Sequence, residues 1–282
     1  MGGPVVVVTD STAYLPEGLA ERFGVSVVPL QVVLGGRTGA EGSEITPTDV
    51  ASALANWVPV GTSRPTPADF AGVYRGALDG GARGVVSLHL SRDLSGTWDS
   101  ARVAADEIDP AVIRVVDSRS AAMGLGFAVL SAAEAAAGGA DLEEAYQAAV
   151  STAERTTTLF YVDTLEHLRR GGRIGAAQAL LGTALSVKPI LHMREGRIVP
   201  LEKVRTASKG VSRLEALAVA AAGDGPVDVA VHHLAAPDRA RTLAERLQVR
   251  LPRLRRLVES EIGAVVGAHV GPGVLGVVVV RS

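Results

Sequence analysis

The chain has no cysteine among its 282 residues, and aromatic side chains make up only 4% of them. The lack of cysteine excludes disulfides, thiolate nucleophiles and cysteine-ligated metal sites. Because aromatic rings are scarce, the hydrophobic residues, 47% of the chain, must build a largely aliphatic core. The absence of disulfides fits a reducing compartment, and we expect a soluble, cytoplasmic protein.

Surplus charge and long apolar runs are absent too. The chain carries 28 Lys and Arg residues against 30 Asp and Glu residues, for a formal net charge of -2. A general nucleic-acid binder carries a basic surplus, so no nucleic-acid partner is predicted. Glu134 and Asp224 interrupt the alanine-rich stretches, and the first residues lack a signal-peptide pattern. We therefore predict no integral membrane segment, and transient contact with a membrane surface stays open.

Motifs for phosphate binding and for nucleophilic catalysis are missing as well. The sequence contains no Walker A motif, no G-x-G-x-x-G fingerprint and no G-x-S-x-G elbow. The pair His232-His233 has no third ligand at a suitable spacing, so no metal is predicted. Asp10 and Asp117 follow strands, and we expect them to accept backbone N–H bonds rather than to bind a metal. With no nucleophile–base pair, we predict no catalytic residue, and an enzyme acting alone is not favoured.

The chain does have a regular alternation of short apolar runs and helical patterns. Such strands separated by helices are typical of a mainly parallel sheet covered on both faces. The strand-like runs of the first half are residues 5–8, 25–34, 85–90 and 112–116, with a glycine-rich loop at 35–42. After about residue 156 the pattern changes, and residues 187–193 and 198–204 indicate a hairpin. We predict a two-domain α/β fold, with a mainly parallel sheet flanked by helices over residues 1–155 and a mixed α/β domain over 156–282.

Two turns rich in hydroxyl side chains stand where strands end and helices begin. They are residues 61–67, GTSRPTP, and residues 91–97, SRDLSGT. Ligands of parallel sheets bind beyond the carboxyl ends of the strands, and helix N-termini favour anions. If the fold joins these turns, Thr62 and Ser95 form a cup for a carboxylate or phosphate. Helix capping explains each hydroxyl equally well. Further candidates in the same turns are Ser63, Ser91 and Gly96.

Three further side chains are candidates for contacts with an anionic ligand or a partner. Arg173 follows two glycines in GGRI, and Arg205 lies in KVRT. His269 lies in GAHVGPG, which we expect to be a tight loop before the last strand, with glycines that let a ligand approach. Each of these residues, taken alone, is equally consistent with an ordinary surface arginine or a hydrogen-bonded core histidine.

Taken together and in their order along the chain, these motifs and several further segments resemble the DegV family of bacterial fatty-acid-binding proteins. The matching segments are VTDST, GTSRPTPADF, LSRDLSGTWDSA, VVDSRSAAMGLG, VDTLEHLRRGGRI, REGRI, KVRT and AHVGPG, and they span nearly the full chain. The resemblance implies one long-chain fatty acid in a buried tunnel between the two domains. It also implies that the hydroxyls of Thr62 and Ser95 hold the carboxylate, and that no cofactor is needed besides this bound ligand.

The resemblance further implies a role in bacterial lipid metabolism as a non-catalytic subunit. Such a subunit presents the carboxylate to a separate ATP-dependent kinase subunit, which forms an acyl phosphate, and Arg173, Arg205 and His269 are associated with that step. Two features depart from the family pattern: Arg64 stands where glutamine is common, and residues 35–42 lack a Tyr-Arg-Asp-like segment. The alternative is a stand-alone phosphate-handling enzyme, with His269 as acid–base catalyst and the two arginines as phosphate clamps.

Overall fold

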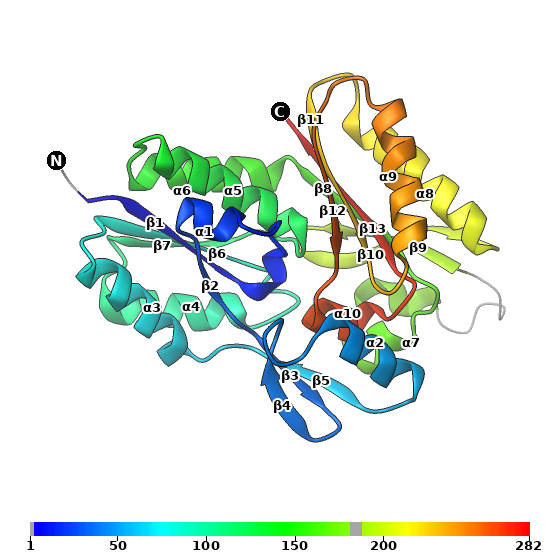
Figure 1. The fold of residues 1–282 in the computed structure, drawn as a ribbon, viewed down its shortest axis with the longest axis horizontal. Coiled ribbons are helices and arrows are strands. Elements are labelled where there is room, and N and C mark those ends of the chain that lie inside the picture. The colour runs from blue at the N-terminus through cyan, green and yellow to red at the C-terminus, as the bar shows by residue number, and fades with distance from the viewer. Residues whose placement is uncertain (1–2, 181–187) are drawn as a thin grey trace. The chain divides into compact units, whose positions relative to one another are not determined.

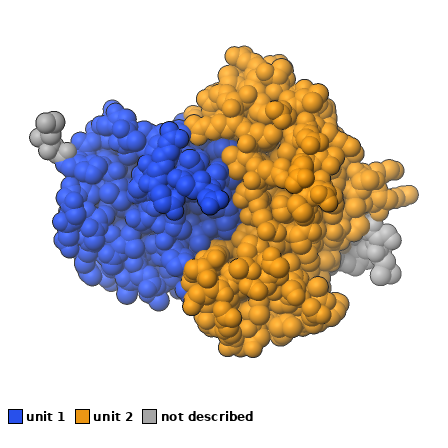
Figure 2. Space-filling view, viewed as in Figure 1, with its two compact units in different colours: residues 1–31, 63–154 blue, residues 32–62, 155–282 orange. Residues whose placement is uncertain are grey.

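The computed structural model describes residues 3–180 and 188–282 (Figure 1). The chain divides into two compact units, which Figure 2 colours separately. Unit 1 comprises residues 1–31 and 63–154, and unit 2 comprises residues 32–62 and 155–282. Unit 2 is therefore assembled from an early segment of the chain and from its second half.

Unit 1 contains a four-stranded sheet in the order β2-β1-β6-β7, and all three strand pairs are parallel. The strands are β1 (Val5–Asp10), β2 (Ser26–Val28), β6 (Gly84–His89) and β7 (Ile113–Asp117). The helices are α1 (Leu19–Phe23), α3 (Pro67–Asp79), α4 (Thr97–Ile108), α5 (Met123–Ala137) and α6 (Leu142–Glu154). Helices α3 and α4 lie on one face of the sheet, and α5 and α6 lie on the other (Figure 1). The predicted parallel sheet flanked by helices is confirmed.

The core of unit 1 explains why strand β6 is mostly apolar. All six residues of β6 are buried. On one face, Phe70 and Tyr74 of α3 pack into one cluster with small alanines of α4 and with Val85. On the other face, α5 is buried on every side over its first eight residues, as expected for a helix that is apolar all round. Helix α3 starts at a capping box in which Thr66 and Asp69 bond each other's backbone N–H.

Unit 2 contains a six-stranded sheet in the order β10-β9-β8-β13-β11-β12. Among the strand pairs that the described residues form in this sheet, only the β11–β12 pair is parallel, and the other four are antiparallel. The strands are β8 (Thr156–Tyr161), β9 (Lys188–Arg194), β10 (Arg197–Val204), β11 (Val227–His233), β12 (Leu254–Glu261) and β13 (Leu275–Arg281). Helices α8 (Ala207–Ala222) and α9 (Pro237–Arg250) share one apolar cluster with the strands. The predicted mixed sheet is confirmed, and so is the hairpin, as β9 and β10; residue 187 lies outside the described residues.

Unit 2 also takes in a small three-stranded sheet and three short helices. The sheet has the order β4-β3-β5, and its strands are β3 (Gln31–Leu34), β4 (Arg37–Ala40) and β5 (Val60–Ser63). The helices are α2 (Pro47–Ala55), α7 (Glu166–Arg170) and α10 (Ala264–Val270). They lie close to one another, and the backbone N–H of Val265 at the start of α10 donates to the Glu41 carboxylate at 2.7 Å. Within the described residues, no helix combines the length and the apolar character needed to span a membrane.

Two expectations about residues 25–42 are wrong. The single strand expected at 25–34 is two strands in different sheets, β2 and β3. Pro29 lies between them and has no N–H to donate to a strand partner, and the N–H of Leu30 turns instead to the Ser11 hydroxyl at 3.0 Å. The glycine-rich segment 35–42 is not entirely loop, because it contains β4.

One buried histidine of unit 2 predicts a loss of stability in mild acid. His232 is 2% exposed, its Nδ1 lies 3.2 Å from the Ser260 carbonyl oxygen, and burial lowers its pKa to about 4. Between this value and the ordinary 6.5, the unfolded chain binds a proton that the folded chain does not, so stability falls as the pH falls through this window. We expect His232 to make the protein about 2 kcal/mol less stable at pH 5 than at pH 7.

The test is urea unfolding at both pH values for the wild type and for His232→Asn, whose amide can replace the Nδ1–H donor but does not titrate. Other histidines contribute equally to both proteins, so the wild type is expected to lose about 2 kcal/mol more than the variant. An equal loss in the two proteins contradicts the assignment.

Candidate functional site

Thr62 and His269 meet inside unit 2, although 207 positions separate them in the chain. Thr62 is the third residue of β5, and His269 lies in the last turn of α10. The Thr62 Oγ1 lies 2.9 Å from the His269 Nε2. Two expectations are corrected here. Thr62 lies in a strand of the three-stranded sheet rather than in a turn, and His269 lies in a helix rather than in a loop.

The backbone after His269 shows why glycines surround it. Gly271 has φ +78° and Gly273 has φ +82°, a region that side chains other than glycine rarely occupy. A Cβ on Gly271 would collide with the His167 ring, and one on Gly273 would collide with the Asp163 carboxylate. The glycines therefore let the chain reverse after α10 while side chains from the α7 region pack directly on its backbone.

The other ring nitrogen of His269 faces Gly171. The Nδ1 is buried and has no hydrogen-bond partner among the described residues, and a Cβ on Gly171 would collide with it. Arg173 lies nearby, with its Nη1 donating to the Gly171 carbonyl oxygen at 2.7 Å. Burial, with a smaller contribution from the Arg173 charge, lowers the pKa of His269 to about 4. The imidazole is therefore neutral at neutral pH.

A neutral imidazole decides what the Thr62 hydroxyl can do. The proton of His269 sits on one of its two nitrogens, and the hydrogen-bond pattern allows either assignment. When Nε2 carries it, the histidine donates to the Thr62 oxygen, and the Thr62 O–H is available to donate elsewhere. That orientation suits an anionic oxygen, which needs donors.

Replacing Gly171 with alanine tests the packing of the His269 ring. The backbone of Gly171 has an ordinary helical φ of -74°, so the substitution strains mainly the contact with the ring, and the Cβ would also lie 3.2 Å from the His167 carbonyl oxygen. We expect the ring to be displaced, the bond to Thr62 to break, and the His269 pKa to rise from about 4 towards its ordinary value. NMR titration of the imidazole measures this. The control is Gly76→Ala, because Gly76 faces open space; an unchanged His269 titration in Gly171→Ala contradicts the packing argument.

Arg205 and Ser63 are exposed. Arg205 follows the end of β10, and Ser63 ends β5. Within the described part of the chain, no hydrogen bond or ion pair joins either of them to Thr62 or His269. The structure thus brings together Thr62, His269 and Arg173 from the predicted set, and it leaves Arg205 open to solvent.

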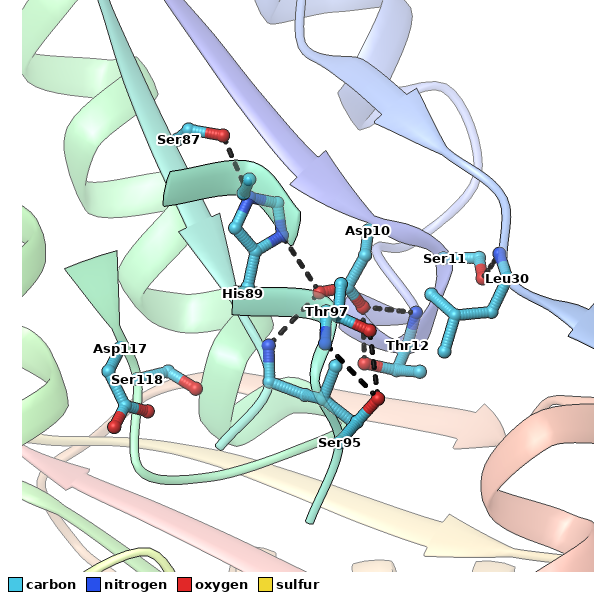
Figure 3. A network of polar contacts seen from close by, with 12 residues as sticks. Asp10, Ser11, Thr12, Leu30, Ser87, His89, Ser95, Thr97, Asp117 and Ser118 are labelled. Carbon is cyan, nitrogen blue, oxygen red and sulfur yellow. Dashed lines mark hydrogen bonds and ion pairs between the residues drawn. The ribbon is translucent and has the colours of Figure 1, made fainter. Parts of the chain in front are cut away.

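Ser95 lies in unit 1, in the segment that joins β6 to α4 (Figure 3). The Ser91 carbonyl oxygen accepts from the Ser95 N–H at 3.1 Å, and the Ser91 N–H donates to the Ser120 carbonyl oxygen at 2.8 Å. The Ser95 Oγ lies 2.9 Å from the Thr97 Oγ1 and accepts from the Thr97 N–H at 3.4 Å. Gly96 is the N-cap residue of α4. Ser91 therefore anchors the segment, and Ser95 presents its hydroxyl at the start of the helix.

A buried polar network underlies this segment, and the sequence analysis missed most of it. Asp10, at the end of β1, accepts from the Leu90 N–H at 3.0 Å, and its Oδ2 lies 3.0 Å from the His89 Nδ1. It also accepts from the Thr12 N–H at 3.0 Å and the Thr12 hydroxyl at 2.5 Å. The expectation that Asp10 accepts backbone N–H bonds is confirmed. The sequence did contain a pattern that could have indicated this network: Ser87 and His89 are two polar residues on the same face of an otherwise apolar strand.

The far end of the network reaches into α3. The His89 Nε2 lies 2.7 Å from the Ser87 Oγ, which accepts from the Tyr74 hydroxyl at 2.7 Å. Burial raises the Tyr74 pKa well above its ordinary value. Donation in one direction, from tyrosine to serine to histidine to aspartate, satisfies every group, with the hydrogens assigned from this pattern. All four side chains belong to fully buried residues.

Comparison with known proteins identifies the family to which this chain belongs. A family model described as "Uncharacterised protein, DegV family" matches residues 4–282. The chain belongs to the DegV family. It is 59% identical over 279 residues to a DegV domain-containing protein of Streptomyces coelicolor, and 99% of each chain is covered.

Two solved structures of the family are similar over the whole chain. The first is a fatty-acid-binding DegV family protein from Thermus thermophilus, with a TM-score of 0.94 and 37% identity, covering 99% of this chain and 100% of that one. The second is DegV from Bacillus subtilis, described as a fatty acid binding protein, with a TM-score of 0.89, 34% identity and full coverage of both chains. The sequence-based assignment to the DegV family is confirmed.

Proposed function

We propose that this DegV family protein binds one long-chain fatty acid. The observation that carries the proposal is the match to the fatty-acid-binding protein of Thermus thermophilus, at 37% identity and a TM-score of 0.94. A second fatty acid binding protein, that of Bacillus subtilis, matches over the full length of both chains. Ligand binding of this kind needs no nucleophile, metal or redox group, which agrees with the residues that the sequence offers.

The carboxylate of the acid is proposed to accept hydrogen bonds from the hydroxyls of Thr62 and Ser95. The contact with neutral His269 supports this role for Thr62 in the tautomer whose proton is on Nε2, because the histidine then donates and the threonine O–H is able to donate to the ligand. The position before the N-cap of α4 supports the role for Ser95, because unpaired N–H groups at a helix start favour a nearby anion.

The hydrocarbon tail supplies most of the binding free energy in this proposal. A saturated chain of about fourteen methylenes gains roughly 11 kcal/mol on leaving water, at about 0.8 kcal/mol per methylene. The cost of immobilising the ligand offsets several kcal/mol of this gain. The hydroxyls therefore need only hold and orient the head group, and neutral donors suffice for that.

We further propose that the protein presents the bound acid, in the cytoplasm, to a separate ATP-dependent kinase subunit that forms an acyl phosphate. Arg173 near His269 and the exposed Arg205 are the cations proposed for the partner and for the phosphate. The stand-alone enzyme gains no support from His269, because an imidazole with a pKa of about 4 is a weak general base at neutral pH.

Lipid extraction tests the proposed ligand. The purified protein is denatured, extracted with organic solvent and examined by mass spectrometry, and we expect about one long-chain fatty acid per chain. Finding none, together with no binding of added fatty acid, contradicts the proposal. The partner is tested separately: a protein captured on the loaded chain must convert the bound acid to an acyl phosphate with ATP, whereas the isolated chain must not.

A further inference from the structure

Arg64 lies across the start of α4. It follows the last residue of β5 in the sequence and belongs to unit 1. A Cβ built on Gly96 would collide with the Nη1 of Arg64 and would lie 2.8 Å from its Cζ. The guanidinium therefore occupies the space in front of the Gly96 α-carbon. Gly96 is the N-cap residue of α4 and the immediate neighbour of Ser95.

No side chain among the described residues balances this charge. Arg64 is exposed, and among residues 3–180 and 188–282 it makes neither an ion pair nor a hydrogen bond. The acidic residue in the first turn of α4 is Asp99, and no ion pair joins it to Arg64. Two other exposed arginines of unit 1 do have carboxylate partners, Arg92 with Asp117 and Arg102 with Asp106.

The helix makes the position of Arg64 electrostatically unfavourable. Helix α4 has 12 residues, and its first N–H groups carry the positive end of the helix dipole. A cation is stabilised at the opposite end of a helix, so the dipole does not hold Arg64 in place. Contact with Gly96 through van der Waals packing is the remaining contribution from the protein, and any side chain of similar length supplies it. An anionic group bound beside Ser95 would attract the positive charge of Arg64 and compensate it.

We propose that Arg64 selects the charge of the ligand head group. In this inference, which rests on the proposed fatty-acid binding, the guanidinium attracts the anionic head of the ligand held by the Ser95 hydroxyl. It favours a carboxylate over a neutral head group on the same hydrocarbon tail. Arg64 is thus a specificity residue: the tail sets how tightly the ligand binds, and Arg64 sets which head group binds best.

The test compares two ligands that differ only in head group. Palmitate and hexadecanol compete against a fluorescent fatty acid on the wild type, Arg64→Gln and Arg64→Lys. Loss of one charge-assisted contact is worth about a ten-fold change in affinity, so Arg64→Gln is expected to bind palmitate about ten-fold more weakly and hexadecanol unchanged. Arg64→Lys is expected to recover part of the palmitate affinity. The control is Arg75→Gln, because Arg75 is an exposed arginine of α3.

The dependence of palmitate affinity on salt concentration is a second readout, which a role of Arg64 in packing alone would not change. Raising the ionic strength from about 0.05 to 0.5 M weakens an attraction between exposed charges. Wild-type palmitate affinity is therefore expected to fall, and that of Arg64→Gln to change less. Unchanged palmitate affinity in Arg64→Gln, or an equal loss for both ligands, overturns the inference. A wild type that binds neither ligand contradicts the proposed function instead, so the two failures are distinct.

Discussion

Replacing Asp10 with alanine is expected to cost about 3–5 kcal/mol of unfolding free energy. Asp10 is fully buried, and its carboxylate accepts from Thr12, from the Leu90 N–H and from the His89 ring. Alanine removes the acceptor and leaves these donors inside the core without a partner. Each buried polar group left unpaired costs about 1–3 kcal/mol, and Asp10 is 0% exposed, so these donors lie away from bulk solvent.

Tryptophan fluorescence can assign this loss to unit 1. The chain has two tryptophans, Trp98 in unit 1 and Trp57 in unit 2. Trp57 is 74% exposed, so Trp57→Phe provides a background in which Trp98 alone reports the urea unfolding of unit 1. In that background, Asp10→Asn is expected to lose less than Asp10→Ala because its amide oxygen still accepts.

The matched control is the other strand-end aspartate of unit 1. The Asp117 side chain is 18% exposed and accepts from the Arg119 N–H at 2.9 Å, so water can reach its donors when it is removed. Asp117→Ala is expected to cost about 1 kcal/mol. If Asp10→Ala costs no more than Asp117→Ala, the buried network does not carry the stability that its geometry indicates.

The same network has the hydrogen-bond geometry of a catalytic triad but lacks the access to substrate that catalysis needs. Ser87, His89 and Asp10 have the hydrogen-bond order of a Ser-His-Asp triad, with 2.7 Å from the serine oxygen to Nε2 and 3.0 Å from Nδ1 to the carboxylate. All three residues are 0% exposed, and the serine oxygen also accepts from Tyr74. A nucleophile must reach its substrate. This arrangement instead connects β1, β6 and the segment that carries Ser95.

The sheets could be predicted from the sequence because their signals are local. A strand covered on both faces is mostly apolar, as in β6, where Ser87 and His89 are the polar exceptions. The hairpin of β9 and β10 follows from two runs separated by a short turn that contains Gly196. These patterns depend on neighbouring residues alone, which is why the mainly parallel and the mixed sheets were both predictable.

The surroundings of Thr62 and His269 could not be predicted in the same way. Nothing near Thr62 in the sequence indicates that β5 joins β3 and β4, or that residues 32–62 pack with the second half of the chain. The glycines around His269 indicated a turn correctly, at the positive φ of Gly271 and Gly273. They did not reveal the seven-residue helix α10, because so short an apolar run has no distinct helical period. The contact between the two residues depends on tertiary packing.

Removing both proposed hydroxyls is expected to weaken fatty-acid binding by roughly 100-fold. Each hydrogen bond to a charged group contributes about 1.5 kcal/mol or more, so the loss of two corresponds to about 3 kcal/mol, or two powers of ten in affinity. Thr62→Ala and Ser95→Ala alone are each expected to lose about ten-fold. Displacement of a fluorescent fatty acid measures all three variants, and thermal unfolding shows whether they remain folded.

Conservative variants separate the hydroxyls from their surroundings. Thr62→Ser keeps the oxygen that bonds His269 at 2.9 Å in the wild type, so it is expected to retain most of the affinity. Ser63→Ala removes the adjacent, exposed hydroxyl and is expected to change nothing. If the double variant binds as tightly as the wild type, neither oxygen holds the carboxylate. If Thr62→Ser is as weak as Thr62→Ala, the methyl group of Thr62 matters rather than its hydroxyl, and the support that His269 gives to the proposed carboxylate site is lost.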